Sequence, residues 1–138
     1  RPTAVYGPYD GNKRVLSIFL KNAMQGKPII VKGAETKLDF TFVEDTVDAA
    51  IQLYLTKKSR NKTVNIGNGR EITIEEIINT ISSLLGYKCK IITKPKRPGD
   101  VRRHFADITL AKNLINYKPK ISFEEGMKRT IDYYKATN

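Results

Sequence analysis

The chain has 138 residues, of which 40% are hydrophobic and 28% are charged, and this size and composition suit one domain with a modest core. Its 25 Lys and Arg residues against 14 Asp and Glu residues give a formal net charge of +11, but the basic residues are dispersed among acidic ones, so we expect a solvated cationic surface rather than a dedicated nucleic-acid-binding face. Neither an apolar run of bilayer length nor a signal-peptide pattern occurs, which predicts a soluble, cytoplasmic protein rather than a membrane protein.

The first half of the sequence alternates predicted strands and helices. Residues 1–7 alternate β-branched and aromatic side chains and end at a Gly-Pro turn, which indicates a strand. Apolar residues at helical spacing predict a helix over 12–26, and a short buried strand follows at 27–33. A further strand is indicated at 38–45, and 46–58 has the pattern of an amphipathic helix. Its apolar stripe consists of Val47, Ala50, Ile51, Tyr54 and Leu55.

The second half continues the same mixture. A strand with a glycine turn is predicted at 62–73, a helix at 74–86 and a strand at 89–95. Two more helices are expected at 107–116 and 122–137. Side chains that can cap helices mark several helix starts: Asp45, Thr73 with Glu76, Asp107, and Ser122 with Glu125.

These elements predict one mixed α/β domain over residues 1–138, without an internal repeat or a linker. A strand at the start of the chain needs a sheet to join, because an unpaired strand leaves its backbone groups unsatisfied. We therefore expect this chain to be the carboxyl-terminal part of a longer protein.

No familiar catalytic or phosphate-binding motif occurs in the sequence. The segment GNGRE lacks the third glycine of a dinucleotide-binding turn, and there is no P-loop, GxSxG, HExxH or CxxC. The sequence has a single cysteine, Cys89, and a single histidine, His104, which cannot form a disulfide or a metal cluster. We therefore expect Cys89 to be a strand residue and His104 to be a surface or edge residue. Paired glutamates fall in predicted first helical turns, where the helix dipole explains them. Local motifs therefore predict neither catalytic residues nor a metal site.

Two segments carry unusual concentrations of charge. In residues 97–103 a Pro-Gly turn presents Arg97 and Asp100 close together, and this pair suits a ligand with both phosphate and hydroxyl groups. Taken alone, a surface turn with a local ion pair is the simpler interpretation. The second segment, 34–45, surrounds an aromatic strand with charged side chains that we expect to be structural: Lys37, Asp39, Glu44 and Asp45.

The order of the segments carries more information than any one motif. Six blocks follow one another: RPTAVYGP, GKPIIVKG, LDFTFVEDTVDAA, VNIGNGREITIEE, RPGDVRRHFADITLAK and INYKPKISFEEGMKRTIDYY. In this order they resemble the carboxyl-terminal portion of the NAD-dependent epimerase/dehydratase family, the extended short-chain dehydrogenases that act on nucleotide sugars. The resemblance covers essentially the whole chain, and it favours a 4-epimerase of the UDP-glucose type.

This resemblance implies that the chain is one part of an enzyme. Family members bind NAD through a glycine-rich turn in an amino-terminal Rossmann domain, which also supplies a Tyr-x-x-x-Lys catalytic pair. Neither feature is present here, so the resemblance implies that this chain alone has no catalytic residues and no activity. It further implies that residues 1–8 form a strand of the missing Rossmann sheet. The remainder would be a small mixed α/β domain that binds a nucleoside-diphosphate sugar, packs on the Rossmann domain and belongs to an enzyme that can form a homodimer.

Binding residues are also implied by the resemblance. Pro2 and Thr3 match positions near the nicotinamide and the sugar, so they are expected neighbours of NAD. The residues Ile30, Val31 and Lys32 match the strand that flanks the nucleotide base, and they are expected base contacts.

The RPGD segment matches the family well, whereas two other positions depart from it. By the resemblance, Arg97 would meet the diphosphate or the ribose, and Asp100 would accept from a ribose hydroxyl. The family often has Asn at the position of Ala4 and Arg at the position of Leu38, and both contacts are in doubt here. Strand alternation points Lys37 to the opposite face, so it is not expected to replace the arginine.

Other functions remain open. A dehydratase or reductase of the same family is a close alternative to the 4-epimerase. A basic nucleic-acid-binding domain would use the charge of +11, although neither a basic recognition helix nor a platform of stacked aromatic residues is evident. An inert piece that associates with itself through surfaces meant for another domain is a third possibility.

Overall fold

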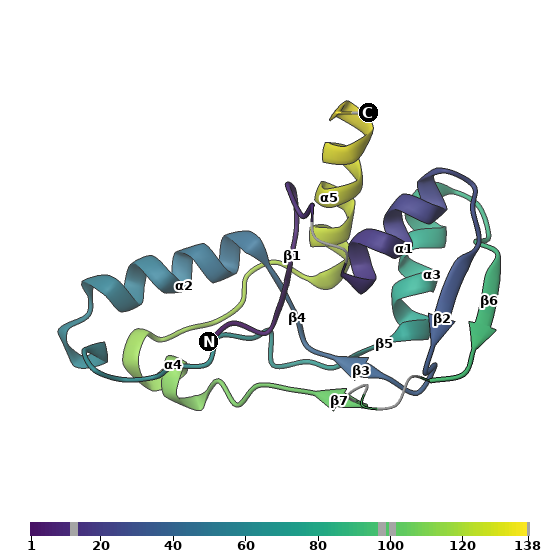
Figure 1. The fold of residues 1–138 in the computed structure, drawn as a ribbon. Helices are drawn as coiled ribbons and strands as arrows, with labels where there is room; N and C mark the ends of the chain where they lie inside the picture. The colour runs from purple at the N-terminus through teal and green to yellow at the C-terminus, as the bar shows by residue number, and fades with distance from the viewer. Residues whose placement is uncertain (12–13, 97–98, 100–101, 138) are drawn as a thin grey trace.

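The computed structural model describes residues 1–11, 14–96, 99 and 102–137. Helices and short strands are mixed along the chain, which confirms the predicted mixed α/β class (Figure 1). The elements are β1 (Ala4–Tyr6), α1 (Val15–Met24), β2 (Ile29–Lys32), β3 (Lys37–Leu38), β4 (Phe40–Phe42), α2 (Val43–Leu55), the 3₁₀ helix η1 (Lys57–Ser59), β5 (Ile72–Thr73), α3 (Ile74–Leu85), β6 (Ile91–Lys94), β7 (Arg103–His104), α4 (Thr109–Ile115) and α5 (Phe123–Thr137).

Within the described part of the chain the strands form three small sheets. Strand β1 pairs with β4 in parallel, and β2 pairs with β6 in parallel. In the third sheet, β3 lies between the antiparallel strand β5 and the parallel strand β7. Parallel pairs need long crossover connections, and α1 lies in the connection from β1 toward β4.

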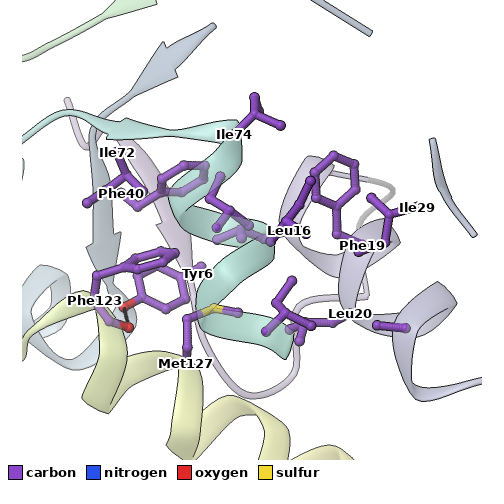
Figure 2. Packing of buried hydrophobic residues seen from close by; sticks show 14 of the residues in the cluster. Tyr6, Leu16, Phe19, Leu20, Ile29, Phe40, Ile72, Ile74, Phe123 and Met127 are labelled. Atoms are coloured by element: carbon purple, nitrogen blue, oxygen red, sulfur yellow. Dashed lines mark hydrogen bonds between the residues drawn. The ribbon is translucent and has the colours of Figure 1, made fainter. Parts of the chain in front are cut away.

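The main core lies where α1, α3 and α5 pack on strands β1, β2 and β4 (Figures 1 and 2). Figure 2 shows apolar side chains from these elements and from β5 meeting in one cluster: Tyr6, Leu16, Phe19, Leu20, Ile29, Phe40, Ile72, Ile74, Phe123 and Met127. The ring of Tyr6 lies 5.5 Å from that of Phe123, and its hydroxyl donates to the Phe123 carbonyl at 3.2 Å. This cluster fixes β1 and β4 against α5.

A second cluster joins α2 and α4. Its buried members are Ala49, Val64, Ile66, Ala106, Ile108, Ala111 and Tyr117. The predicted stripe of α2 does not face this cluster, because Val47, Ile51, Tyr54 and Leu55 are between 49% and 89% exposed. The helix instead buries Asp45 and Ala49, so its most apolar face has no partner among the described residues.

Two of the predicted caps are confirmed. The Thr73 hydroxyl accepts from the Glu76 N–H at 3.1 Å at the start of α3, and the Ser122 hydroxyl accepts from the Glu125 N–H at 3.2 Å at the start of α5. Asp107 is not the N-cap of α4, which is Ile108, but its carboxylate accepts from the Thr109 N–H at 2.9 Å at the start of that helix.

The prediction that Asp45 caps a helix is wrong. The α2 helix begins earlier, at Val43, and Asp45 lies within its first turn. The buried carboxylate accepts from the N–H groups of Lys120 at 2.9 Å and Ile121 at 3.1 Å. Asp45 thus connects α2 to the segment before α5, because its carboxylate oxygens accept from backbone N–H groups of that segment rather than from its own helix.

The predicted strand and turn at 62–73 is also only partly correct. Pairing is limited to β5 and to an isolated bridge between Pro2 and Ile66. Between them the Gly67–Gly69 turn wraps around the buried carboxylate of Asp39, and this backbone therefore does not form a continuous ladder.

No helix in the described ranges has both the length and the apolar composition to cross a bilayer.

Candidate functional site

A hollow of about 550 Å³ lies between the start of the chain and the β3–β7 pair. Its lining comes from residues 2–5, Arg14, Leu38 and His104. The hollow therefore contains both residues predicted to lie near NAD, Pro2 and Thr3, and both positions that depart from the family pattern, Ala4 and Leu38. The sequence places these segments far apart, and the sheet topology brings them together.

The register of two short strands puts Leu38 and His104 side by side. Strands β3 and β7 run parallel, with Leu38 opposite His104 and Lys37 opposite Arg103. The Asp39 N–H donates to the His104 carbonyl at 2.9 Å. Alternation along each strand then turns Leu38 and His104 to the hollow, and it turns Lys37 and Arg103 to the other face.

The opposite rim is held by the first residues of the chain. The Thr3 N–H donates to the Ile66 carbonyl at 2.9 Å, and the Ala4 N–H donates to the Asp39 carbonyl at 3.2 Å. The hydroxyl of Thr3 lies 2.7 Å from that of the buried Thr41. These contacts fix the rim, and they already engage the Thr3 hydroxyl.

The buried carboxylate of Asp39 organises the loops beneath the hollow. It accepts backbone N–H groups from Asn68 at 2.8 Å, Gly69 at 3.3 Å and Ala106 at 3.4 Å. Burial raises the pKa of Asp39, while these donors and the nearby His104 act in the opposite direction. A Cβ on Gly67 would lie 2.6 Å from its Oδ2 atom, so glycine is required there for space. Asp39 therefore has a structural role, as expected for its segment.

The predicted base-contacting strand divides between the surface and the core. Ile30 is 40% exposed and Lys32 is half-buried, and they stand opposite Ile92 and Lys94 of β6. Val31 is only 3% exposed and packs in the main core. Its side chain cannot contact a base, so any contribution of Val31 comes from its main chain.

The other two predicted binding residues, Arg97 and Asp100, lie outside the described residues. The chain on either side of them is described: β6 ends at Lys94, and β7 begins at Arg103. The segment that carries them therefore connects the Ile30 and Lys32 strand pair to the sheet that borders the hollow.

Sequence reasoning missed three of the lining residues, Val5 and the two basic ones, Arg14 and His104. A guanidinium nitrogen of Arg14 donates to the Val5 carbonyl at 3.1 Å, which draws the start of α1 to the rim. The expectation of a surface or edge position for His104 is confirmed, because it is exposed on the two-residue strand β7. Only its register with Leu38 reveals its neighbours, and no local pattern carries that information.

The chemistry of this lining suits binding rather than catalysis. Among the described lining residues, Arg14 and His104 are basic and none is acidic. The rest of the wall is mainly apolar, and among the described residues no group of His, Cys, Asp and Glu could hold a metal ion. An anionic ligand with an apolar part matches this arrangement.

A second hollow of about 740 Å³ lies between α1 and α5. Tyr9 and Tyr133 line it with ring centroids 4.6 Å apart, and the Tyr134 hydroxyl donates to the Asp10 carbonyl at 2.8 Å. It contains none of the residues that the resemblance assigns to ligands, so size alone does not make it the better candidate.

Comparison with known proteins gives consistent results. A family model described as GDP-mannose 4,6 dehydratase matches residues 3–130. The chain is 35% identical to a UDP-glucuronate 4-epimerase of Thermodesulfobacterium geofontis, over 95% of this chain and 41% of that protein.

Two solved structures show the same fold over nearly the whole chain. A UDP-glucose 4-epimerase of Thermotoga maritima with UDP-glucose superposes with a TM-score of 0.91 at 33% identity, over 99% of this chain and 45% of that one. A UDP-glucuronic acid 4-epimerase of Bacillus cereus, in complex with UDP-glucuronic acid and NAD, gives a TM-score of 0.94 at 26% identity, over 100% and 45%. The chain thus spans less than half the length of each of these proteins.

Proposed function

Because the chain belongs to the NAD-dependent epimerase/dehydratase family, we propose that it forms the nucleotide-sugar-binding part of a UDP-sugar 4-epimerase. The observation that carries this proposal is the shared hollow. Residues 2–4 and Leu38, which the resemblance assigned to the cofactor and substrate side, line one hollow, where the other described lining residues include two basic side chains and no acidic one.

Each predicted contact has a role in this proposal. The base lies against Ile30 and Lys32 and the main chain of Val31, on the outward face of β2. Arg97 neutralises the diphosphate or bonds the ribose, and Asp100 accepts from a ribose hydroxyl, both by analogy with the family. These residues orient the sugar and offset the charge of the diphosphate.

In this proposal the chain contributes little to NAD binding. Pro2 and Thr3 fit a position beside the cofactor because they line the hollow, but the sequence contains no glycine-rich turn for a dinucleotide. When bound, NAD would supply reversible hydride transfer at a sugar carbon. The residues of this chain exclude water and hold the sugar in place, and the proton transfers fall to groups outside it.

The missing partner in this proposal is an amino-terminal Rossmann domain. The exposed stripe of α2, Val47 to Leu55, provides an apolar face for it, and β1 would be a strand of its sheet. Without that domain the chain has no catalytic base and should not turn over substrate. A homodimer of the intact enzyme would use surfaces of the other domain.

A dehydratase is the second candidate, because the matching family model is described by that activity. Incubating the protein that carries this chain with UDP-glucose, UDP-glucuronic acid and GDP-mannose separates the two. Proton NMR should show the 4-epimer of a UDP-sugar for the first proposal and a 4-keto-6-deoxy sugar for the second. Turnover of none of them would contradict both, and turnover by residues 1–138 alone would contradict the assignment of catalysis to another domain.

A further inference from the structure

Asn68 and Gly69 form the only Asn-Gly pair in the sequence. In such a pair the backbone nitrogen of the glycine can attack the side-chain carbonyl carbon of the asparagine, because glycine has no side chain to hinder the approach. The nitrogen gives up its proton to hydroxide, a bond forms between this nitrogen and Cγ, and the side-chain nitrogen leaves as ammonia. Water then opens the resulting succinimide to aspartate or to isoaspartate.

The turn restricts position 69 to glycine. Gly69 has a φ of 75°, in the left-handed region that favours glycine, and a Cβ there would lie 3.1 Å from the Cδ1 atom of Ile108. A bulkier residue, which would slow the attack, is therefore unfavourable. Gly69 is exposed and Asn68 is half-buried, so water reaches both residues. The fold thus keeps a reactive pair at a solvent-accessible place.

The buried carboxylate of Asp39 holds both backbone nitrogens of this pair. Its Oδ1 atom accepts from the Asn68 N–H at 2.8 Å, and its Oδ2 atom accepts from the Gly69 N–H at 3.3 Å. Attack requires the Gly69 nitrogen to lose its proton and to move toward the asparagine side chain. A hydrogen bond to a carboxylate opposes both steps, because it retains the proton and places a negative charge beside the anion that would form.

The turn is also connected to the rim of the first hollow. The Thr3 N–H donates to the Ile66 carbonyl at 2.9 Å, and Thr3 lines that hollow. A Cβ on Gly67 would lie 3.1 Å from the Cγ2 atom of Thr3, so the turn and the rim are packed closely. A change in the backbone of the turn is therefore transmitted to Thr3.

We propose that Asn68 is a deamidation site that Asp39 suppresses, and that its conversion to isoaspartate loosens the rim at Thr3. Isoaspartate adds a carbon atom to the main chain between residues 68 and 69. The two N–H groups then no longer match the two oxygens of Asp39, which are fixed because the carboxylate is buried. This proposal concerns the chemistry of the chain itself and is independent of the ligand that occupies the hollow.

The test incubates the protein that carries this chain at mildly alkaline pH and follows deamidation by peptide mapping with mass spectrometry. Folded wild type should deamidate Asn68 at least about tenfold more slowly than wild type unfolded in guanidinium chloride, which corresponds to one charge-assisted hydrogen bond. Asp39→Asn and Asp39→Ala should each lose most of this protection. Asn61, which is exposed and precedes Lys62, is the reference in the same digest, and its rate should be equal in all folded variants.

A further variant separates the hydrogen bond from overall stability. Gly126→Ala crowds the Phe42 ring, because the added Cβ would lie 2.8 Å from it, and it should destabilise the fold at a distance from the turn. Its rate at Asn68 should stay as slow as that of wild type. Thermal unfolding of each variant establishes that folded protein is compared, and the comparison of folded with unfolded wild type needs no variant.

Hydrogen exchange tests the effect on the rim. The isoaspartate-containing fraction of aged wild type, separated by ion exchange, should exchange the Thr3 amide faster and keep the protection of the Ile29 amide. An unchanged Thr3 amide would overturn the effect on the rim. Folded wild type that deamidates Asn68 as fast as the unfolded chain, or Gly126→Ala that accelerates it as much as the Asp39 variants do, would overturn the protective role of Asp39.

Discussion

At the scale of single residues, Asp39 has the largest influence on the hollow. Its Oδ1 atom accepts from Asn68, and its Oδ2 atom accepts from Gly69 and Ala106, so the 67–69 turn and the segment at Ala106 both depend on two carboxylate oxygens. An amide has only one oxygen. Asp39→Asn therefore presents an N–H₂ group to at least one backbone donor, and we predict a loss of about 1–3 kcal/mol of stability in urea unfolding. The matched change Asp132→Asn, at an exposed position on α5, should cost far less, and equal losses would refute this role.

Gly126 gives a second prediction at this scale. A Cβ there would lie 2.2 Å from the Tyr6 hydroxyl oxygen and 2.8 Å from the Phe42 ring. In an open helix Gly→Ala is favourable by up to about 1 kcal/mol. Overpacking reverses the sign here, and Gly126→Ala should lower stability by roughly 1–3 kcal/mol in thermal or urea unfolding. Gly11→Ala, with open space around the added atom, is the control; an unchanged or raised stability for Gly126→Ala would show that α5 packs differently.

At the scale of elements, the short strand β7 depends on pairs outside the hollow. The Lys37 N–H donates to the Arg102 carbonyl and the Asp39 N–H donates to the His104 carbonyl, each at 2.9 Å, and Arg103 is paired with Glu71. Hydrogen bonding to Arg103 lowers the pKa of Glu71. The contribution of this pair is present above the unfolded pKa of Glu71, and it is lost as pH falls through the lower, folded value.

Acid should therefore loosen β7 before the main core. We predict that the hydrogen-exchange protection factor of the Asp39 amide falls about twofold on acidification, and that added salt has a similar effect because the pair is exposed. Glu71→Gln should remove both responses. The Ile29 amide, which donates to the Lys90 carbonyl, serves as a reference within the β2–β6 pair. A decrease of equal size at Ile29 would mean that Glu71 has no local role.

Elements that depend on residues close together in the sequence could be predicted, whereas features that depend on pairing between distant segments could not. Phe40 and Phe42 alternate with polar residues, and Thr73 precedes Glu76 at the spacing of a helix cap, so sequence alone identified β4 and the start of α3. The β3–β7 register depends on pairing between distant segments, and no local pattern encodes it. Asp45 was misassigned for the same reason, since its partners lie more than 70 residues away.

At the scale of the whole molecule, the exposed apolar face of α2 is the surface that the proposed partner domain would cover. Ile51 is 53% exposed and Leu55 is 71% exposed, on a helix whose other side is packed. Sequence periodicity found this stripe, but it could not tell whether the stripe faces the core of this chain or another surface.

The isolated chain should associate with itself through that face. Light scattering across a concentration series should show growing particles for residues 1–138 and a smaller response for Ile51→Glu with Leu55→Glu. Gln52→Glu with Asn79→Glu adds the same charge at exposed polar positions and should behave as wild type. A strict monomer at all concentrations would contradict this use of the α2 face.

The central claim is that the hollow and the outward face of β2 together form the nucleotide-sugar site. Hydrogen exchange of the protein that carries this chain, with and without saturating UDP-glucose, UDP-glucuronic acid or GDP-mannose, tests it most directly. The account predicts new protection at residues 2–5, 29–32 and 103–105 with at least one of these compounds. Protection confined to the hollow between Tyr9 and Tyr133, or none with any of them, would contradict it.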